Sequence, residues 1–402
     1  MKEQIVIVGA GHAAGQVVAT LKQKKFAGRI VLIGDEPFLP YQRPPLSKKY
    51  LAGELPAERL HVKPESFYAD EQIELKLGTR VAAIDTQAAT VTTADGDAVR
   101  YDKLILATGS RVRRLEIPGA DLAGIHYVRS IADVEAMQSA FVPGARAVII
   151  GAGYIGLEVA AVARQLGLEV SVVETAPRVM SRVVCPEVSA FYERQHAAHG
   201  VELLLNTGTE SFTGDDQVDG VKLADGRRLD ADVVVVGVGI LPNTELAEAA
   251  GLETANGIVV DDHCRTSAAD VFAVGDCTCH PNAIYNRNVR LESVHNALEQ
   301  AKTAAANACG DDVAYSQVPW FWSDQYDIKL QIAGLSQGYD DVLTRGDPEE
   351  ASFSCVYLKE GRVIAVDAVN APKDFMQSKA LIASRATPDR ERLQSEALKE
   401  LA

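Results

Sequence analysis

The chain has 402 residues, of which 47% are hydrophobic and 24% are charged, and its formal net charge is -15 at pH 7. This length allows two or three domains with separate cores, and the composition is typical of a globular protein. The negative charge argues against nucleic acid as a partner, because phosphate binding requires a basic surface. The first residues, MKEQIVIVGAG, lead directly into a strand, and no apolar run approaches the roughly 18 residues of a membrane span. We therefore expect a cytoplasmic protein with no membrane partner.

The first predicted unit of strand, glycine turn, helix and strand occupies residues 4–36. The apolar run QIVIV leads into GAGHAAG at residues 9–15, a helix-like segment follows, and RIVLIGDE ends at Asp35 and Glu36. In such a turn the first glycine makes the bend, the second lets the backbone approach a pyrophosphate, and the helix N-terminus offers unpaired N–H groups. An acidic residue at the end of the second strand accepts hydrogen bonds from an adenosine ribose.

The same order of elements returns at residues 146–174. RAVII leads into GAGYIG, a helix-like segment follows, and EVSVVE ends at Glu174. A single glycine motif is weak evidence for a dinucleotide site. Two copies, each followed by a helix, a strand and an acidic residue, predict two such sites. Glu174 would repel a 2'-phosphate, which favours NADH over NADPH, whereas the nearby Arg178 favours the opposite choice.

Each predicted unit ends with one further apolar strand. These strands are KLILATGSR, at residues 103–111, and VVVVGVGILPNTEL, at residues 233–246. DVFAVGDC, at residues 270–277, is a further strand that ends at Gly-Asp. The residues after Pro319 lack a glycine motif and contain alternating strands, such as KLQIAG and SFSCVYLKEG, before a helix-like tail. The predicted fold class is α/β, with two Rossmann-like dinucleotide-binding domains of glutathione-reductase type and a C-terminal α+β domain with an antiparallel sheet.

The six cysteines include no C-x-x-C pair, which indicates free thiols in a reducing compartment. Cys277, Cys279 and His280 lie within four residues, but a tetrahedral metal site needs a fourth ligand that is not evident. We therefore expect no metal.

Seven segments together resemble one protein family: GAGHAAG, RPPLSKKYL, ILATGS, GAGYIGLE, VFAVGDC, RLESVHNALEQA and PWFWSDQ. The chain resembles, over nearly its whole length, the NADH-dependent ferredoxin reductases that serve oxygenases, of the putidaredoxin reductase and biphenyl dioxygenase reductase type. These belong to the two-dinucleotide flavoprotein disulfide reductase superfamily. RPPLSK and PWFWSDQ are the discriminating segments, because the glycine motifs occur throughout that superfamily.

In that family the first glycine unit holds FAD and the second holds NADH. The resemblance implies that FAD is bound by Gly9, Gly11, Ala13, Asp35, Arg43, Pro45, Lys48, Val81, Ala107, Thr108, Gly109, Arg129, Asp276, Val294 and Trp320. It implies that NADH is bound by Gly151, Gly153, Tyr154, Ile155, Gly156 and Glu174. Residues 1–110 and 242–318 are then expected to form the FAD-binding domain, residues 111–241 the NADH-binding domain, and residues 319–402 the C-terminal domain.

Residues 35–60 contain no cysteine, so a reduced flavin would have no thiol relay there and would pass its electrons directly to an outside acceptor. Nicotinamide gives up two electrons at once and an iron-sulfur centre accepts one, whereas a flavin can do both. The chain has no four-cysteine cluster at iron-sulfur spacing, so the acceptor should be a separate protein. The resemblance implies a [2Fe-2S] ferredoxin that supplies a cytochrome P450 or a Rieske-type oxygenase.

Lys48 and Glu158 are the expected catalytic pair. By resemblance Lys48 points at the flavin N5 edge and pairs with Glu158. A unit positive charge ~4 Å from a reduced anionic flavin is worth about 4 kcal/mol at an effective dielectric near 20, which favours hydride uptake. The alternatives are that Lys48 is a solvated loop lysine, or that the adjacent Lys49 takes this role.

By resemblance Trp320 could stand between the flavin edge and a docked ferredoxin, although alternating aromatics in a strand are more often core residues. Arg43, Arg287 and Arg290 are candidates for a basic patch that receives an acidic ferredoxin. The alternatives to a ferredoxin reductase are a rubredoxin reductase and a redox-sensing flavoprotein of the apoptosis-inducing-factor type. We expect a monomer or a weak homodimer.

Overall fold

The computed structural model describes residues 2–401, which fold into two compact units. Unit 1 is formed by the residues up to Arg43, by Glu58–Arg111 and by Leu241–Pro319, and unit 2 by Pro44–Ala57, Val112–Ile240 and the residues from Trp320 onward. The chain crosses between units close to the predicted boundaries at residues 110, 241 and 319. The placement of residues 44–57 in unit 2 was not expected from the sequence, and the three-domain division stays a prediction.

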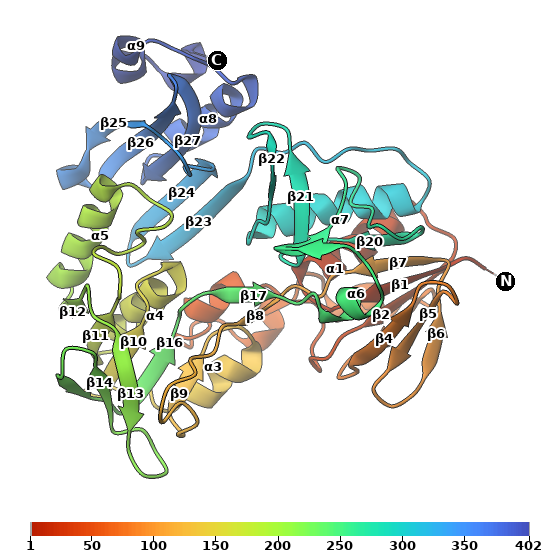
Figure 1. Ribbon diagram of the computed structural model, residues 1–402, viewed down its shortest axis with the longest axis horizontal. Coiled ribbons are helices and arrows are strands. Elements are labelled where there is room, and N and C mark those ends of the chain that lie inside the picture. Colours follow the sequence, from red (N-terminus) through yellow and green to blue (C-terminus); the bar gives the residue numbers. More distant parts are fainter. Residues whose placement is uncertain (1, 402) are drawn as a thin grey trace. The chain divides into compact units, whose positions relative to one another are not determined.

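Unit 1 is built on a five-stranded parallel sheet in the order β20-β7-β1-β2-β3 (Figure 1). Smaller sheets are formed by β4-β5-β6 and by β18-β19-β21-β22. The elements are β1 (Gln4–Val8), α1 (His12–Gln23), β2 (Arg29–Ile33), η2 (Ala57–Leu60), α2 (Glu65–Tyr68), β3 (Ile73–Lys76), β4 (Val81–Asp85), β5 (Thr90–Thr93), β6 (Ala98–Arg100), β7 (Lys103–Leu106), β8 (Ser110–Val112), β17 (Ile240–Pro242), α6 (Glu245–Ala249), β18 (Thr254–Ala255), β19 (Gly257–Val259), β20 (Val271–Ala273), β21 (Thr278–Asn282), β22 (Arg287–Val289) and α7 (Val294–Ala308).

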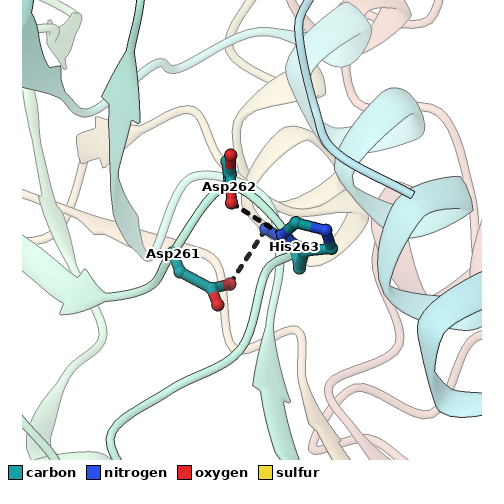
Figure 2. A group of neighbouring side chains, drawn as sticks. All are labelled: Asp261, Asp262 and His263. Carbon is teal, nitrogen blue, oxygen red and sulfur yellow. Dashed lines mark hydrogen bonds and ion pairs between the residues drawn. The ribbon is translucent and has the colours of Figure 1, made fainter. Parts of the chain in front are cut away.

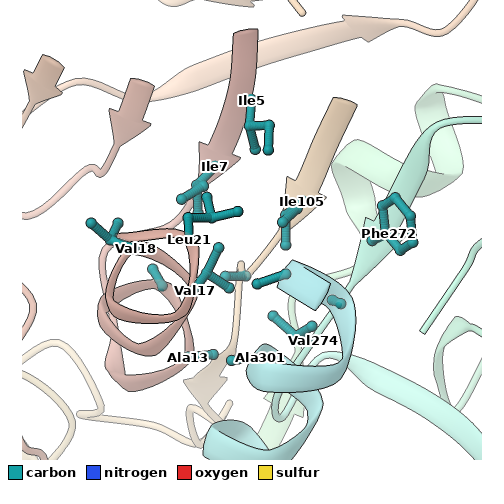
Figure 3. Close-up of a cluster of buried hydrophobic side chains, with 14 of the residues drawn as sticks. Ile5, Ile7, Ala13, Val17, Val18, Leu21, Ile105, Phe272, Val274 and Ala301 are labelled. Atoms are coloured by element: carbon teal, nitrogen blue, oxygen red, sulfur yellow. The ribbon is translucent and has the colours of Figure 1, made fainter. Parts of the chain in front are cut away.

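The central strand β1 is apolar throughout because both of its faces are buried. Successive side chains of a strand point to opposite faces, so Ile5 and Ile7 pack with α1 and α7, as Figure 3 shows, whereas Val6 and Val8 pack into a second core. A parallel sheet covered on both faces requires such a continuous apolar run. Because β1 and β7 run parallel, their carboxyl ends lie at the same edge of the sheet, where α1 begins.

Unit 2 contains a second five-stranded parallel sheet, in the order β12-β11-β10-β16-β9, and an antiparallel sheet in the order β23-β24-β27-β26-β25 (Figure 1). The elements are η1 (Pro44–Ser47), β9 (Ile125–Tyr127), α3 (Ile131–Gln138), β10 (Arg146–Ile150), α4 (Tyr154–Gln165), β11 (Glu169–Val173), α5 (Pro186–Ala198), β12 (Val201–Leu204), β13 (Thr209–Thr213), β14 (Gly220–Leu223), β15 (Arg228–Asp230), β16 (Val233–Val236), β23 (Trp320–Gln325), β24 (Ile328–Gly334), β25 (Asp341–Asp347), η3 (Pro348–Glu350), β26 (Ser352–Lys359), β27 (Arg362–Val369), α8 (Pro372–Ser384), α9 (Arg390–Ser395) and η4 (Leu398–Glu400).

Helix α4 connects the two sheets of unit 2, since it packs on β10 and β11 and also contacts β23 and η1. Its sequence, YIGLEVAAVARQ, buries eight consecutive residues from Gly156 to Ala163, which explains why small residues and valine dominate it. One of these buried residues is Glu158, so a charged group is enclosed within the unit.

The predicted fold class is confirmed, including both Rossmann-like sheets and the antiparallel C-terminal sheet. Among residues 2–401, no helix combines the length and the apolar character that crossing a membrane requires.

Candidate functional site

The glycine turn that follows β1 leaves its backbone accessible at one point and closely packed at another. Gly9 has φ +108°, and a Cβ on it would lie 2.1 Å from the carbonyl oxygen of Ala107. A Cβ on Gly11 would meet no atom within 4 Å, and Gly11 begins α1 without a side-chain cap. The start of α1 therefore combines open space beside Gly11 with N–H groups that no side chain caps, which fits the pyrophosphate of a dinucleotide.

The turn after β7 lies beside this helix start. The side chains of Thr108 and Asn243 each donate a hydrogen bond of 2.8 Å to the other residue's carbonyl oxygen, which holds the turn. Ser110 donates to Asp276, the acidic residue of the Gly-Asp motif, at 2.9 Å. Gly275 precedes it with φ +86°, and a Cβ there would lie 3.5 Å from that of Ala13.

Helix α7 brings a second helix start to unit 1. Val294 is its first residue, and Ser293 caps it by accepting a hydrogen bond from the N–H of Asn296 at 3.1 Å. Val81, which was expected to bind FAD, is 5% exposed and belongs to the core. The residues expected to bind FAD through backbone atoms thus lie at strand and helix ends.

The acidic residues after β2 differ in their surroundings. Asp35 is exposed, whereas Glu36 accepts hydrogen bonds from Tyr41 at 2.6 Å and from Arg43 at 2.5 Å. The expected contact of Asp35 with the FAD stays a prediction, and the charge of Arg43 is paired with that of Glu36. Arg290 is similarly paired with Glu292 at 2.6 Å. Arg43 and Arg290, both proposed for a docking patch, are thus paired with acidic residues of their own chain.

In unit 2, the second glycine turn uses each of its glycines differently. A Cβ on Gly151, where φ is +101°, would lie 2.5 Å from the carbonyl oxygen of Gly237. A Cβ on Gly156 would lie 2.0 Å from the carbonyl oxygen of Gly151, so this glycine lets α4 pack closely on the turn. Gly153 has open space in the Cβ direction and begins α4 without a side-chain cap. This turn fits a second pyrophosphate.

Glu174, at the end of β11, reaches back to this turn. Its carboxylate accepts hydrogen bonds of 2.8 Å from the N–H groups of Ala152 and Ala176. Arg178 donates instead to the carbonyl oxygen of Val184 at 2.7 Å and to the hydroxyl of Ser189 at 2.6 Å. The residue that could have favoured a 2'-phosphate is therefore turned into its own loop, which favours NADH.

The first residues of α4 present aromatic and apolar groups. The Tyr154 ring lies 4.8 Å from that of Phe321, and burial raises the pKa of Tyr154 well above its usual value. Ile155 is 41% exposed, unusual for a residue of its type. Both residues were expected in the NADH site.

The carboxylate of Glu158 is 1% exposed and accepts three hydrogen bonds. Lys48 donates to Oε2 at 2.6 Å, Ser47 donates to the same oxygen, and Ser323 donates to Oε1 at 2.6 Å. The expected pairing of Lys48 with Glu158 is present, while Lys49 is exposed. Sequence reasoning missed Ser47 and Ser323, although both lie in the discriminating segments RPPLSK and PWFWSDQ.

Three other expected residues also lie in unit 2. The Trp320 ring lies 5.5 Å from that of Trp322, and the Lys379 ammonium lies 4.7 Å above it. Arg129 donates its backbone N–H to Asp133 at 3.1 Å. Pro45 lies within η1, which directly precedes Lys48. Their expected contacts with FAD stay predictions.

Within residues 2–401, the cysteines and one group of acidic residues with a histidine are further candidates for chemistry. All six cysteines are free thiols, and burial raises the pKa of Cys277. Figure 2 shows Asp261, Asp262 and His263, a group whose ligand atoms lie close enough for an ion. Its carboxylates are exposed. The Nδ1 atom of His263 lies 2.6 Å from the Asp262 carboxylate, and the backbone N–H of His263 donates to the Asp261 carboxylate at 2.9 Å.

Comparison with known proteins identifies the family. Residues 3–301 match the pyridine nucleotide-disulphide oxidoreductase family, and residues 320–402 match the reductase C-terminal family. The chain belongs to the pyridine nucleotide-disulphide oxidoreductase family. Within it, the chain is 46% identical over 391 residues to the ferredoxin reductase subunit of 5,5'-dehydrodivanillate O-demethylase from Sphingobium sp., covering 96% of this chain and 95% of that protein.

Solved structures of the same family agree. The crystal structure of the covalent putidaredoxin reductase–putidaredoxin complex matches with a TM-score of 0.96 and 43% identity, covering 99% of this chain and 98% of that one. The rubredoxin-NAD(+) reductase of Pseudomonas putida is 40% identical over 370 residues, covering 92% of this chain and 96% of that protein. The expected membership among oxygenase-coupled ferredoxin reductases is confirmed, as are the oxidoreductase class and the cofactors FAD and NAD.

Proposed function

We propose that this chain oxidises NADH and passes electrons one at a time, through FAD, to a [2Fe-2S] ferredoxin that supplies a cytochrome P450 or a Rieske-type oxygenase. The observation that carries the proposal is the pair of open glycine turns, at Gly11 and Gly153, in a chain with no cysteine at residues 35–60. Two dinucleotides can bind, and residues 35–60 supply no thiol relay for the flavin.

The residues of unit 1 are proposed to hold FAD. Gly9, Gly11 and Ala13 would cradle its pyrophosphate, Asp35 its adenosine ribose, and Asp276 its ribityl chain or pyrophosphate. When bound, FAD accepts hydride and releases single electrons. The carboxylates of Asp35 and Asp276 lie at strand ends, where parallel sheets of this type bind their ligands.

The residues of unit 2 are proposed to hold NADH and to assist its oxidation. Gly153 opens the way to the pyrophosphate, and Glu174 is placed to accept hydrogen bonds from a ribose. Lys48 supplies a positive charge that favours hydride uptake, and Glu158 fixes its position. The preference for NADH follows from the negative charge of Glu174 and from the inward orientation of Arg178.

We also infer a cytoplasmic location, because six free thiols suit a reducing compartment. The rubredoxin reductase alternative shares both cofactors, but the relative of that name is less similar, at 40% identity, than the ferredoxin reductase subunit at 46%. A ferredoxin is therefore the favoured acceptor.

The test is electron transfer from NADH, catalysed by the purified holoprotein, to a [2Fe-2S] ferredoxin, to a rubredoxin, or to neither. We expect cytochrome c reduction at many turnovers per second only with the ferredoxin, and no effect of alkylating the accessible thiols. Faster reduction of rubredoxin would favour the alternative acceptor. Loss of turnover on alkylation would contradict transfer without a thiol, and a long-lived NADH-flavin complex with negligible turnover would indicate a redox sensor.

A further inference from the structure

A chain of hydrogen bonds ends at the second oxygen of the buried Glu158 carboxylate. Ser323 is 2.6 Å from Glu158, Gln325 is 3.2 Å from the Ser323 hydroxyl, and His196 is 2.8 Å from the Gln325 amide. The Tyr326 hydroxyl lies 3.2 Å from the other ring nitrogen of His196. The side chains of Glu158, Ser323, Gln325 and His196 are each at most 1% exposed, so water cannot replace these bonds.

The donors of this chain can point in only one direction. The Glu158 carboxylate, paired with Lys48, only accepts, so the Ser323 hydroxyl must donate to it. The Ser323 oxygen then accepts from the amide N–H of Gln325, which leaves the Gln325 oxygen facing His196. His196 must therefore carry its proton on Nε2.

The state of His196 agrees with that assignment. Burial lowers its pKa to about 4, so the ring is neutral at pH 7 and its Nδ1 can accept the Tyr326 hydroxyl. Hydrogen bonds aligned in one direction polarise one another and strengthen in surroundings of low dielectric. The aligned hydrogen bonds, from the Tyr326 hydroxyl to the Ser323 hydroxyl, thus direct partial positive charge at Glu158.

The outer end of the chain is fixed by a strained turn. Tyr326 and Asp327 connect β23 to β24, and Tyr326 has φ +56°, a left-handed conformation that a bulky residue rarely adopts. A left-handed conformation has an energetic cost for any residue with a Cβ. The Tyr326 ring stacks on that of His199 at 3.7 Å and 11°, a contact that offsets part of the cost.

We propose that Ser323, Gln325 and His196 are positioning residues that hold the Glu158 carboxylate, and through it the Lys48 ammonium, in a single orientation. Their effect on NADH oxidation rests on the proposed function. In this hydrogen-bond chain, His196 belongs to α5, and Ser323 and Gln325 belong to β23. The C-terminal sheet therefore contributes side chains that hold the catalytic pair, in addition to packing beside it.

The first test is independent of activity. Nitrogen-15 NMR of the holoprotein labelled at its eight histidines reports the tautomer of each ring, and a His196→Phe variant identifies the relevant signal. We expect a neutral His196 with its proton on Nε2. A proton on Nδ1, or rapid exchange between the two tautomers, would overturn the directed chain.

The second test separates positioning from packing. Ser323→Ala should slow the reduction of bound FAD by NADH about tenfold, the equivalent of one charge-assisted hydrogen bond worth about 1.4 kcal/mol. The NADH concentration at half-saturation should not change, and Ser323→Thr should restore the rate. Ser354→Ala is the matched control, since Ser354 is equally buried in β26 and bonds Asp374 instead.

An unchanged rate in Ser323→Ala, or an equal loss in Ser354→Ala, would overturn the positioning role. If NADH fails to reduce FAD even in the unmodified protein, the proposed function falls. In that case the tautomer of His196 still decides whether the directed chain exists.

Discussion

The ion pair of Lys48 and Glu158 sets the electrostatics at the residue scale. With its ammonium 2.6 Å from a carboxylate oxygen, Lys48 does not act as an isolated charge, and about 4 kcal/mol for a unit charge at ~4 Å is an upper bound. The contribution of the pair depends on its orientation, because the positive end must point toward the reacting group. Contacts that fix this orientation, from Ser47 and Ser323, therefore matter as much as the charge.

Lys48→Met is expected to slow the reduction of FAD by NADH by at least tenfold, the effect of losing about 1.4 kcal/mol of stabilisation at the transition state. FAD retention should change little, because the main cofactor contacts are proposed to lie in unit 1. Stopped-flow absorbance measures the rate, and the flavin content of the purified variant measures retention. Lys49→Met is the control, since Lys49 is the exposed neighbour; equal rates in the two variants would remove the role of Lys48.

At the scale of single elements, each glycine turn combines a packing requirement with a binding requirement. Gly151 must be glycine because its φ is +101° and a side chain would clash with the Gly237 carbonyl. Gly153 begins α4 with φ -81° and ψ -175°, a conformation that alanine also adopts. Gly151 is therefore required for folding, whereas Gly153 is expected to be required for binding NADH, which stays a prediction.

Gly153→Ala should leave the thermal unfolding temperature near that of the unmodified protein and weaken NADH binding at least tenfold, since one methyl group fills the path of the pyrophosphate. Gly151→Ala should instead lower the unfolding temperature by several degrees, roughly the effect of 1–3 kcal/mol of backbone strain. Calorimetry and NADH titration measure the two effects. Normal NADH binding by Gly153→Ala would contradict the proposed site.

At the scale of the whole molecule, unit 2 contains a buried acid that links stability to pH. Asp367, in β27, is fully buried and accepts a hydrogen bond from Tyr357, and burial raises its pKa to about 7. The Tyr357 oxygen accepts from the N–H of Cys185 at 2.8 Å, so the group joins β26, β27 and the start of α5. Ionising this carboxyl in the folded state is unfavourable.

Stability should therefore fall as the pH rises from about 4 to about 7, because the unfolded chain releases this proton near pH 4 while the folded chain keeps it. Asp367→Asn removes the dependence, so the unfolding temperature of the variant relative to the unmodified protein should rise across this range. The expected change is on the order of 3 kcal/mol. The exposed Asp215, changed to Asn, is the control; parallel curves for all three proteins would contradict the prediction.

The sequence by itself determined the two dinucleotide folds and the family, because glycine turns and buried parallel strands have local signatures, and it showed that residues 35–60 contain no cysteine. It also paired Lys48 with Glu158, but only through resemblance. The tertiary structure alone decided that Ser323, 165 residues from Glu158 along the chain, completes this site, and that Arg43 is paired with Glu36. Neither contact has a local sequence pattern. The Ser323 bond exists only when β23 packs against α4, and the Arg43 pair exists only when the loop that contains Glu36 and Arg43 is folded.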